Sequence, residues 1–212
     1  MSQIVLFAQQ KGGAGKTMLL TQVAVSLAGR GRQVAIIDLD PQRSASEWHE
    51  LRVNRLGEDA GGISLIESTN WRASADIHKG ARKASIVLVD SPGTAEVLKR
   101  VALKAANFCV VPCQPSAADV WACRTTLQLI EEAGIQHKVL LNRVPPRSNA
   151  ADAAVAELAG FGAPVIDATV GTRSAFVEAF MTGAGVTETA RKSKAAAEIE
   201  AVVKELKKPL GL

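Results

Sequence analysis

QKGGAGKT, at residues 10–17, is the stretch of sequence that decides the fold. It stands between a short apolar run and a pattern typical of a helix. A strand, a glycine-rich loop and a helix in this order bind phosphate, because backbone N–H groups and the helix N-terminus point at the anion. The spacing predicts that Lys16 contacts the β- and γ-phosphates and that the Thr17 hydroxyl ligates Mg²⁺. The usual pattern GxxxxGK[ST] begins with glycine, whereas this chain has Gln10 there and carries Lys11 inside the loop.

Outward from this loop, short β-branched runs alternate with longer stretches at helical spacing. This alternation predicts an α/β fold of the phosphate-loop type: a doubly wound, mostly parallel sheet flanked by helices on both faces. We expect one domain over residues 1–212. The predicted strands are 4–8, 34–38, 63–66, 86–90, 108–112, 139–142 and a short one near Val165. The predicted helices are 16–29, 44–56, 71–83, 95–105, 117–133 and 150–159, with two more after Arg173.

Two further clusters of polar residues end predicted strands. Asp38 and Asp40 follow the second apolar run, and Asp90 ends the fourth. Ligands of an open parallel sheet collect at the carboxyl ends of its strands, so these acids face the same crevice as the phosphate loop. Three carboxylates would repel a triphosphate unless Mg²⁺ lay between them. We therefore interpret Asp38 and Asp90 as ligands of the metal or of its waters, and Asp40 as the residue that orients an attacking water.

Composition narrows the class of protein. The chain is 47% hydrophobic and 22% charged, which is typical of a compact globular domain, and its formal net charge is +4. Three cysteines without a CxxC pair indicate reduced, buried thiols, and we expect Cys109 and Cys113 in the core. No apolar run approaches the roughly 20 residues that span a bilayer, so we expect a soluble, cytoplasmic protein. Core packing is also the expectation for Trp121.

The motifs resemble those of the ParA/MinD group of ATPases, which have a deviant phosphate loop, and most closely the small ParA-type partition proteins. The likeness covers KGGAGKT together with DLDPQ (38–42), VDSPG (89–93), VVPCQPSAADVWA (110–122) and LLNR (140–143). It implies a slow, partner-stimulated ATPase with ATP and Mg²⁺ as cofactors. It also implies an ATP-dependent homodimer that encloses two nucleotides at its interface.

The resemblance also implies roles for individual residues. Lys11 matches the lysine that crosses to the partner's ATP, Asp40 matches the residue needed for hydrolysis, and Asp119 falls in the dimer-interface segment. Asn142 and Arg143 match positions beside the adenine. The implied catalytic residues are Lys11, Lys16 and Asp40; the implied metal residues are Thr17, Asp38 and Asp90. The implied nucleotide-binding residues are Lys11, Gly12, Gly13, Ala14, Gly15, Lys16, Thr17, Met18, Asn142 and Arg143.

One departure from the family pattern concerns the residue after Thr17. Family members commonly carry a second threonine there, and this chain has Met18. Magnesium ligation is kept, but the contact of the second hydroxyl near the α-phosphate is lost.

Partition relatives bind DNA without sequence preference as ATP dimers, and a ParB-like or adaptor partner releases them by stimulating hydrolysis. The resemblance therefore implies association with the nucleoid. Such binding needs cations on one face of the dimer. The candidate DNA-binding residues are Arg173, Arg191, Lys192 and Lys194. Acids of the last predicted helix offset its other lysines, which makes Lys207 and Lys208 weaker candidates.

Two alternatives stay open at this point. A MinD-like protein would need a C-terminal membrane helix, but Pro209 and Gly211 are expected to break a helix there, and we expect no membrane contact. A metabolic ATPase would use the same phosphate loop for chemistry on a small molecule, without binding DNA.

Overall fold

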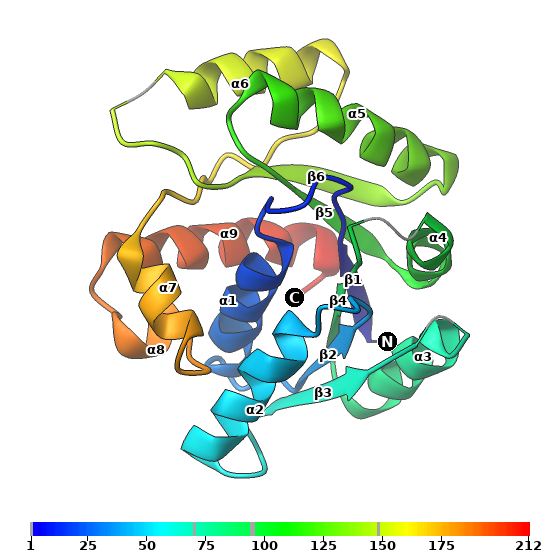
Figure 1. Cartoon of the computed structure of the whole chain (residues 1–212), viewed down its shortest axis with the longest axis vertical. Coiled ribbons are helices and arrows are strands. Elements are labelled where there is room, and N and C mark those ends of the chain that lie inside the picture. Colours follow the sequence, from blue (N-terminus) through cyan, green and yellow to red (C-terminus); the bar gives the residue numbers. More distant parts are fainter. Residues whose placement is uncertain (1, 70, 94–95, 148) are drawn as a thin grey trace.

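The computed structural model describes residues 2–69, 71–93, 96–147 and 149–212, and its centre is a six-stranded sheet (Figure 1). Every strand pairing in the described sheet is parallel, and the spatial order is β3-β2-β4-β1-β5-β6. The strands are β1 (Gln3–Phe7), β2 (Val34–Asp38), β3 (Ile63–Glu67), β4 (Ile86–Asp90), β5 (Phe108–Cys113) and β6 (Gln136–Leu141).

The strand order brings the three polar clusters together. β4 lies between β2 and β1, and the register aligns Asp38 and Phe7 with Asp90 on its two sides. The phosphate loop follows β1, and Asp40 lies two residues beyond the end of β2. Their meeting at one edge of the sheet follows directly from three adjacent parallel strands that end at the same level.

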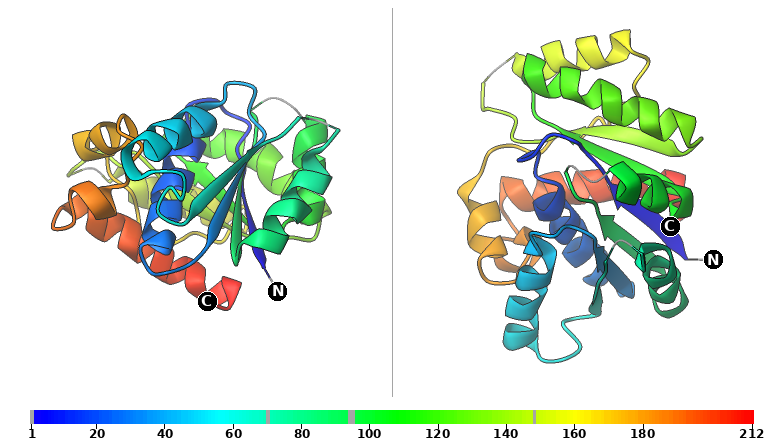
Figure 2. Two further views of the ribbon diagram at one scale, coloured as in Figure 1. Left: turned by 90° about the horizontal axis from the view of Figure 1, so that it is seen from below. Right: turned by 45° about the vertical axis from the view of Figure 1, so that its right-hand side comes forward.

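Helices cover both faces of the sheet, as Figure 2 shows from two sides. Both faces need cover because successive side chains of a strand point to opposite faces of the sheet and are apolar on both. In β1, Val5 and Phe7 belong to one hydrophobic cluster, and Ile4 and Leu6 belong to the other. One face packs against α1 (Lys16–Ala28), α2 (Ser44–Leu56), α7 (Ser174–Phe180), α8 (Val186–Thr189) and α9 (Lys194–Leu210). The other packs against α3 (Ala73–Lys83), α4 (Glu96–Ala105), α5 (Ala117–Glu132) and α6 (Ala150–Gly160). This arrangement confirms the predicted doubly wound α/β fold.

Three details differ from the sequence-based expectation, and one expected boundary lies outside the described residues. The run near Val165 forms a single bridge to Val139, because only one residue pair meets the sheet edge there. Three described helices follow Arg173, because a short helix, α8, separates α7 from α9. The predicted helix start at Ala95 lies outside the described residues. Trp121 lies on α5 with 56% of its surface exposed, and its indole N–H donates to Glu157, so it is not a core residue.

The C-terminal segment is continuous with α9. The helix runs through Pro209 and ends at Leu210, with Gly211 in the left-handed conformation as its C-cap. Leu206 and Leu210 are buried in the same cluster as α1. Pro209 does not break the helix, so that part of the expectation was wrong, whereas Gly211 ends the helix as expected; Leu206 and Leu210 are packed in the core. In the described part of the chain, every helix is too short or too polar to cross a bilayer.

Candidate functional site

The phosphate loop is held open by glycines and fixed by one buried asparagine. Gly13 and Gly15 have φ angles of +80° and +89°, a backbone conformation that residues with side chains rarely adopt. Asn142, fully buried, donates from Nδ2 to the Ala14 carbonyl at 2.8 Å. A Cβ at Gly15 would lie 2.3 Å from that Nδ2 atom. Glycine is therefore required at position 15 both by its backbone conformation and by the asparagine packed against it.

Gln9 braces the start of the loop and was not among the predicted site residues. Its side chain is almost fully buried, and Oε1 accepts from the Gln10 N–H at 2.7 Å and from the Thr126 hydroxyl at 3.1 Å. Nε2 donates to the Cys123 sulfur at 3.0 Å. These bonds tie the loop to α5. The signal in the sequence was a glutamine directly after a buried apolar strand, where an unpaired amide would be costly.

The Thr17 hydroxyl donates to Asp90 Oδ2 at 2.6 Å. Asp90 is fully buried, and this burial raises the pKa of its carboxyl to about 7, although the bond from Thr17 opposes the rise. Its second oxygen, Oδ1, is buried without a hydrogen-bond partner. A hydroxyl and an orphaned carboxylate oxygen at a phosphate cradle fit a Mg²⁺ ion, which prefers oxygen ligands and keeps waters and phosphate oxygens around it. Within the described residues, no three acidic, histidine or cysteine side chains group to hold a metal by themselves.

Asp38 and Asp40 differ in how free their oxygens are. Asp38 Oδ2 accepts from the backbone and hydroxyl of Ser46 at 2.9 and 2.7 Å, and Oδ1 accepts from the Asp40 N–H at 3.1 Å. Burial raises the pKa of Asp38, against the lowering effect of Ser46. Asp40 is only partly buried and lines the phosphate cavity. Asp38 therefore holds the first turn of α2 in place, while Asp40 faces the space where a ligand would lie.

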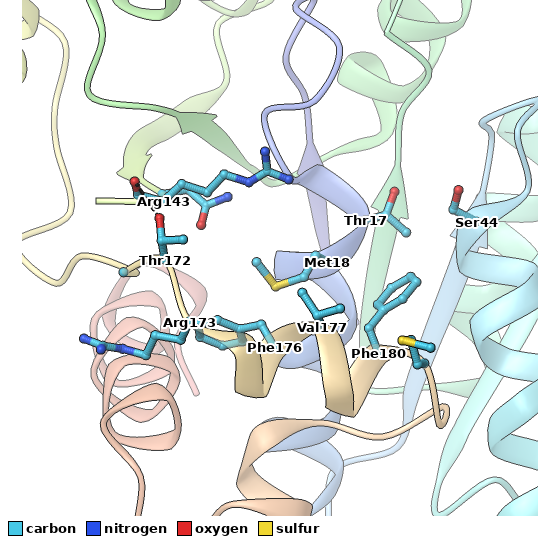
Figure 3. Close-up of a pocket in the computed structure, with 12 residues that line it drawn as sticks. Thr17, Met18, Ser44, Arg143, Thr172, Arg173, Phe176, Val177 and Phe180 are labelled. Carbon is cyan, nitrogen blue, oxygen red and sulfur yellow. Dashed lines mark hydrogen bonds between the residues drawn. The ribbon is translucent and has the colours of Figure 1, made fainter. Parts of the chain in front are cut away.

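Two adjoining cavities meet at the start of α1. One, of about 450 Å³, is lined by the loop glycines, Lys16 and Asp40. The other, of about 490 Å³, is mainly apolar, and Figure 3 shows Val177 of α7 next to Met18, with Phe176 and Phe180 of the same helix on either side. The pair has the form expected for a ligand with an anionic chain and a flat apolar end. Four residues line both cavities: Thr17, Met18, Ser44 and Arg143.

Lys11 lies apart from the other loop residues. It does not contribute to the lining of the phosphate cavity. Its ammonium instead forms an ion pair with Asp119 Oδ2 at 2.8 Å, with 39% of its side chain exposed against 7% for Asp119. The two residues predicted for a dimer interface thus contact each other within one chain. Their separation by more than a hundred positions made this contact invisible in the sequence.

The cationic candidates divide into two groups. Arg173 is engaged by Glu198 of α9, with Nε 2.9 Å from Oε2. Arg191, Lys192 and Lys194 are exposed at the start of α9, and none has an acid within ion-pair distance in the described ranges. Only the second group presents unpaired charge to solvent.

Comparison with known proteins agrees with this geometry. The model of the CobQ/CobB/MinD/ParA nucleotide binding domain matches residues 5–186. The "Maintenance of carboxysome distribution protein A" of Gloeobacter kilaueensis is 31% identical over 201 residues, covering 93% of this chain and 90% of that protein. The protein of the same description from Halothiobacillus neapolitanus is 27% identical, with 94% of each chain covered.

Among solved structures, the septum site-determining protein MinD from Pyrococcus horikoshii, complexed with Mg-ADP, superposes with a TM-score of 0.77. It is 18% identical, and the match covers 97% of this chain and 96% of that one, which shows a shared fold. The family model matches most of the chain, from the strand before the phosphate loop to the start of α8. The chain therefore belongs to the CobQ/CobB/MinD/ParA family of nucleotide-binding domains.

Proposed function

We propose that this protein is an ATPase switch that positions DNA or another intracellular cargo. As an MgATP-bound homodimer it binds DNA nonspecifically, and hydrolysis of ATP to ADP and phosphate, stimulated by a partner, releases it. One observation carries the proposal: Lys16 and Thr17 line the phosphate cavity, whereas Lys11 of the same loop is turned away from it toward Asp119. A lysine held outside its own site is available to the nucleotide of a second copy.

Within one chain, we assign the phosphates of ATP and the Mg²⁺ ion to different sets of residues. Lys16 and the loop N–H groups would hold the phosphates, and Thr17 and Asp90 would hold Mg²⁺, which neutralises charge on the β- and γ-phosphates when bound. Asp38 suits a role toward metal-bound water better than direct ligation, since both its oxygens already accept hydrogen bonds. Asp40 faces the cavity and is assigned to orient the attacking water.

Dimerisation requires Lys11 to leave Asp119. Lys11 is 39% exposed, so water can solvate its ammonium during the exchange, whereas Asp119 is 7% exposed and keeps the Ser116 hydroxyl as its donor. A triphosphate with Mg²⁺ offers a stronger attraction than one carboxylate. Bound ATP in the partner would thus move Lys11 from an intrachain to an interchain contact, which is the switch.

Light scattering with and without ATP tests this assignment. The parent chain is expected to double in mass with MgATP, and Asp40→Ala to remain a dimer longer because hydrolysis is slowed. Lys11→Ala is expected to bind nucleotide as a single chain. A normal ATP-dependent dimer of Lys11→Ala with normal turnover would remove the interchain role of Lys11.

Binding to arbitrary DNA is assigned to Arg191, Lys192 and Lys194. They are adjacent, exposed and without acidic partners in the described part of the chain, so their charge is available to phosphates. Arg173 is a weaker candidate because Glu198 neutralises it. The relatives named for carboxysome distribution suggest a protein body as cargo. The partner that links the cargo is proposed, from the family resemblance, to be an adaptor or ParB-like protein.

Retention on random-sequence duplex DNA tests the binding surface. We expect ATP-dependent retention that falls steeply with salt and is lost in Arg191→Glu. Lys79→Glu is the matched control: it makes the same charge change on exposed α3, on the opposite face of the sheet. Equal loss in both variants would indicate a general charge effect. Absence of retention at low salt, with ATP binding intact, would favour the metabolic alternative.

A further inference from the structure

Arg143 occupies a distinctive place between the two cavities. It follows the buried Asn142 and lines both the phosphate cavity and the apolar cavity. Figure 3 shows its side chain extended across the opening toward the start of α1. In the described residues, its guanidinium has neither an acidic partner nor a hydrogen bond; only its carbonyl is engaged, accepting from Thr172. An unpaired cation therefore stands where the two halves of the site meet.

Arg173 in the same cavity provides the contrast. Its guanidinium is directed to α9, where Glu198 holds it through two oxygens. Its charge is thus satisfied within the chain. Of these two cavity arginines, Arg143 is the one with charge to offer a ligand.

The backbone of Arg143 supports a role in binding. Its φ is +53°, in the left-handed region that residues with side chains rarely adopt. Glycine would fit this conformation without cost, yet arginine stands there. Arg147 has a similar φ of +57° but lines neither cavity, so it is the combination of this conformation with a place between the two cavities that sets Arg143 apart.

Met18 explains why an added cation is useful at this point. It follows Thr17 in the first turn of α1, and it lines both cavities. A thioether is a very weak hydrogen-bond acceptor and donates nothing to a phosphate. Beyond its backbone N–H groups, the start of α1 therefore offers no side-chain donor at position 18, where a nucleotide would pass from its base to its phosphates.

We infer that Arg143 binds the phosphate chain of the nucleotide held by its own subunit, at the end nearest the base, and so supplies the side-chain donor that Met18 cannot provide. The inference rests on the proposed function, and it differs from the role that the family resemblance implies, in which Arg143 lies beside the adenine. A guanidinium suits this task because its donors can engage two phosphate oxygens together. Arg143 is proposed to contact the nucleotide of its own chain, whereas Lys11 is proposed to contact the nucleotide of the second copy.

Competition binding of ATP, GTP and inorganic tripolyphosphate tests the inference. Measurements are made in a Lys11→Ala background, at concentrations where light scattering shows single chains, so that no second subunit contributes. We expect Arg143→Ala to weaken all three ligands by a similar factor, about 10- to 100-fold, as for loss of a charge-assisted hydrogen bond. Arg143→Lys is expected to restore part of the loss for each ligand.

Two controls separate binding from folding. Arg147→Ala removes another exposed arginine of the same loop, with φ of +57°, that lines neither cavity, and it is expected to bind as the parent does. Arg143→Gly removes both cation and strain, so it is expected to lose affinity like Arg143→Ala while melting at the parent's temperature or above.

Each remaining outcome has one meaning. A loss confined to ATP, with GTP and tripolyphosphate unchanged, would place Arg143 at the base and overturn the inference. Unchanged affinity for all three ligands would overturn it as well. If the parent chain bound no nucleotide, or if Lys16→Ala bound as well as the parent, the proposed function itself would fail.

Discussion

Asp90→Asn isolates the cost of holding a buried carboxylate beside the phosphate loop. In the absence of metal, burial raises the pKa of Asp90 from 3.8 to about 7, and Oδ1 finds no hydrogen-bond partner. The folded protein thus holds this proton more tightly than the unfolded chain does. Stability consequently falls as pH rises between these two pKa values, and it changes little above pH 7, where both states are ionised.

The size of the effect follows from the same shift. Integrated from about pH 5 to about pH 8, the ionisation of Asp90 removes about 2 to 3 kcal/mol from the free energy of unfolding. Asparagine keeps the shape and can still accept from Thr17, but it does not titrate. Between about pH 5 and about pH 8, the free energy of unfolding of Asp90→Asn should therefore rise relative to that of the parent by about 2 to 3 kcal/mol.

Urea unfolding in EDTA at several pH values measures this difference. Asp152→Asn, which removes an exposed carboxylate on α6, serves as the control, with a change expected to stay within about 0.5 kcal/mol. Addition of MgADP should stabilise the parent more than Asp90→Asn, because the metal repays the buried charge only in the parent. A difference between Asp90→Asn and the parent that does not vary with pH would refute the reasoning.

Three other substitutions probe the same site. Lys16→Ala should weaken ATP binding by about 100-fold, since it removes a charged donor from the cradle, and calorimetry with ATP checks this. Asp40→Ala should slow phosphate release by about 100-fold with ATP affinity retained; unchanged turnover would remove Asp40 from the water-orienting role. Asp119→Asn frees Lys11 from its ion pair, so dimers should form at up to about fivefold lower ATP concentration in light scattering. A higher ATP requirement would mean that Asp119 supports the dimer directly.

Much of the fold could be predicted because local patterns and topology agreed. β2 and β4 begin and end where their β-branched runs do, and α2 occupies the predicted residues. Asp38 and Asp90 could be brought together from sequence since both end strands of one parallel sheet, and parallel strands end at one edge. Local patterns were weaker where a segment depends on distant partners. The run near Val165 has strand-like residues but meets the sheet at one pair only.

Site details that depend on side-chain pairing were not predictable. Nothing near Lys11 in the sequence indicates that its ammonium contacts Asp119. The role of Gln9 in bracing the loop depends on hydrogen bonds with Thr126 and Cys123 of α5, which are distant in the sequence. The expectation that Trp121 packs in the core was wrong for a related reason. Its size favours burial on average, but its position on α5 faces outward and its indole N–H is satisfied by Glu157.

Charge along α9 shows most clearly why composition misleads. By composition alone, the acids of this helix offset its lysines, which makes Lys207 and Lys208 weaker candidates for contact with DNA. In the fold, three of those acids reach outside the helix: Glu198 to Arg173, Glu200 to Arg30 and Glu205 to Lys138. Arg173 loses its free charge by this pairing, and the lysines of α9 lose the partners assumed for them. Which cations near and on α9 remain unpaired is therefore decided by the ion pairs that its acids form with other elements. These pairs depend on the three-dimensional packing of α9 against α1, β6 and the segment before α7.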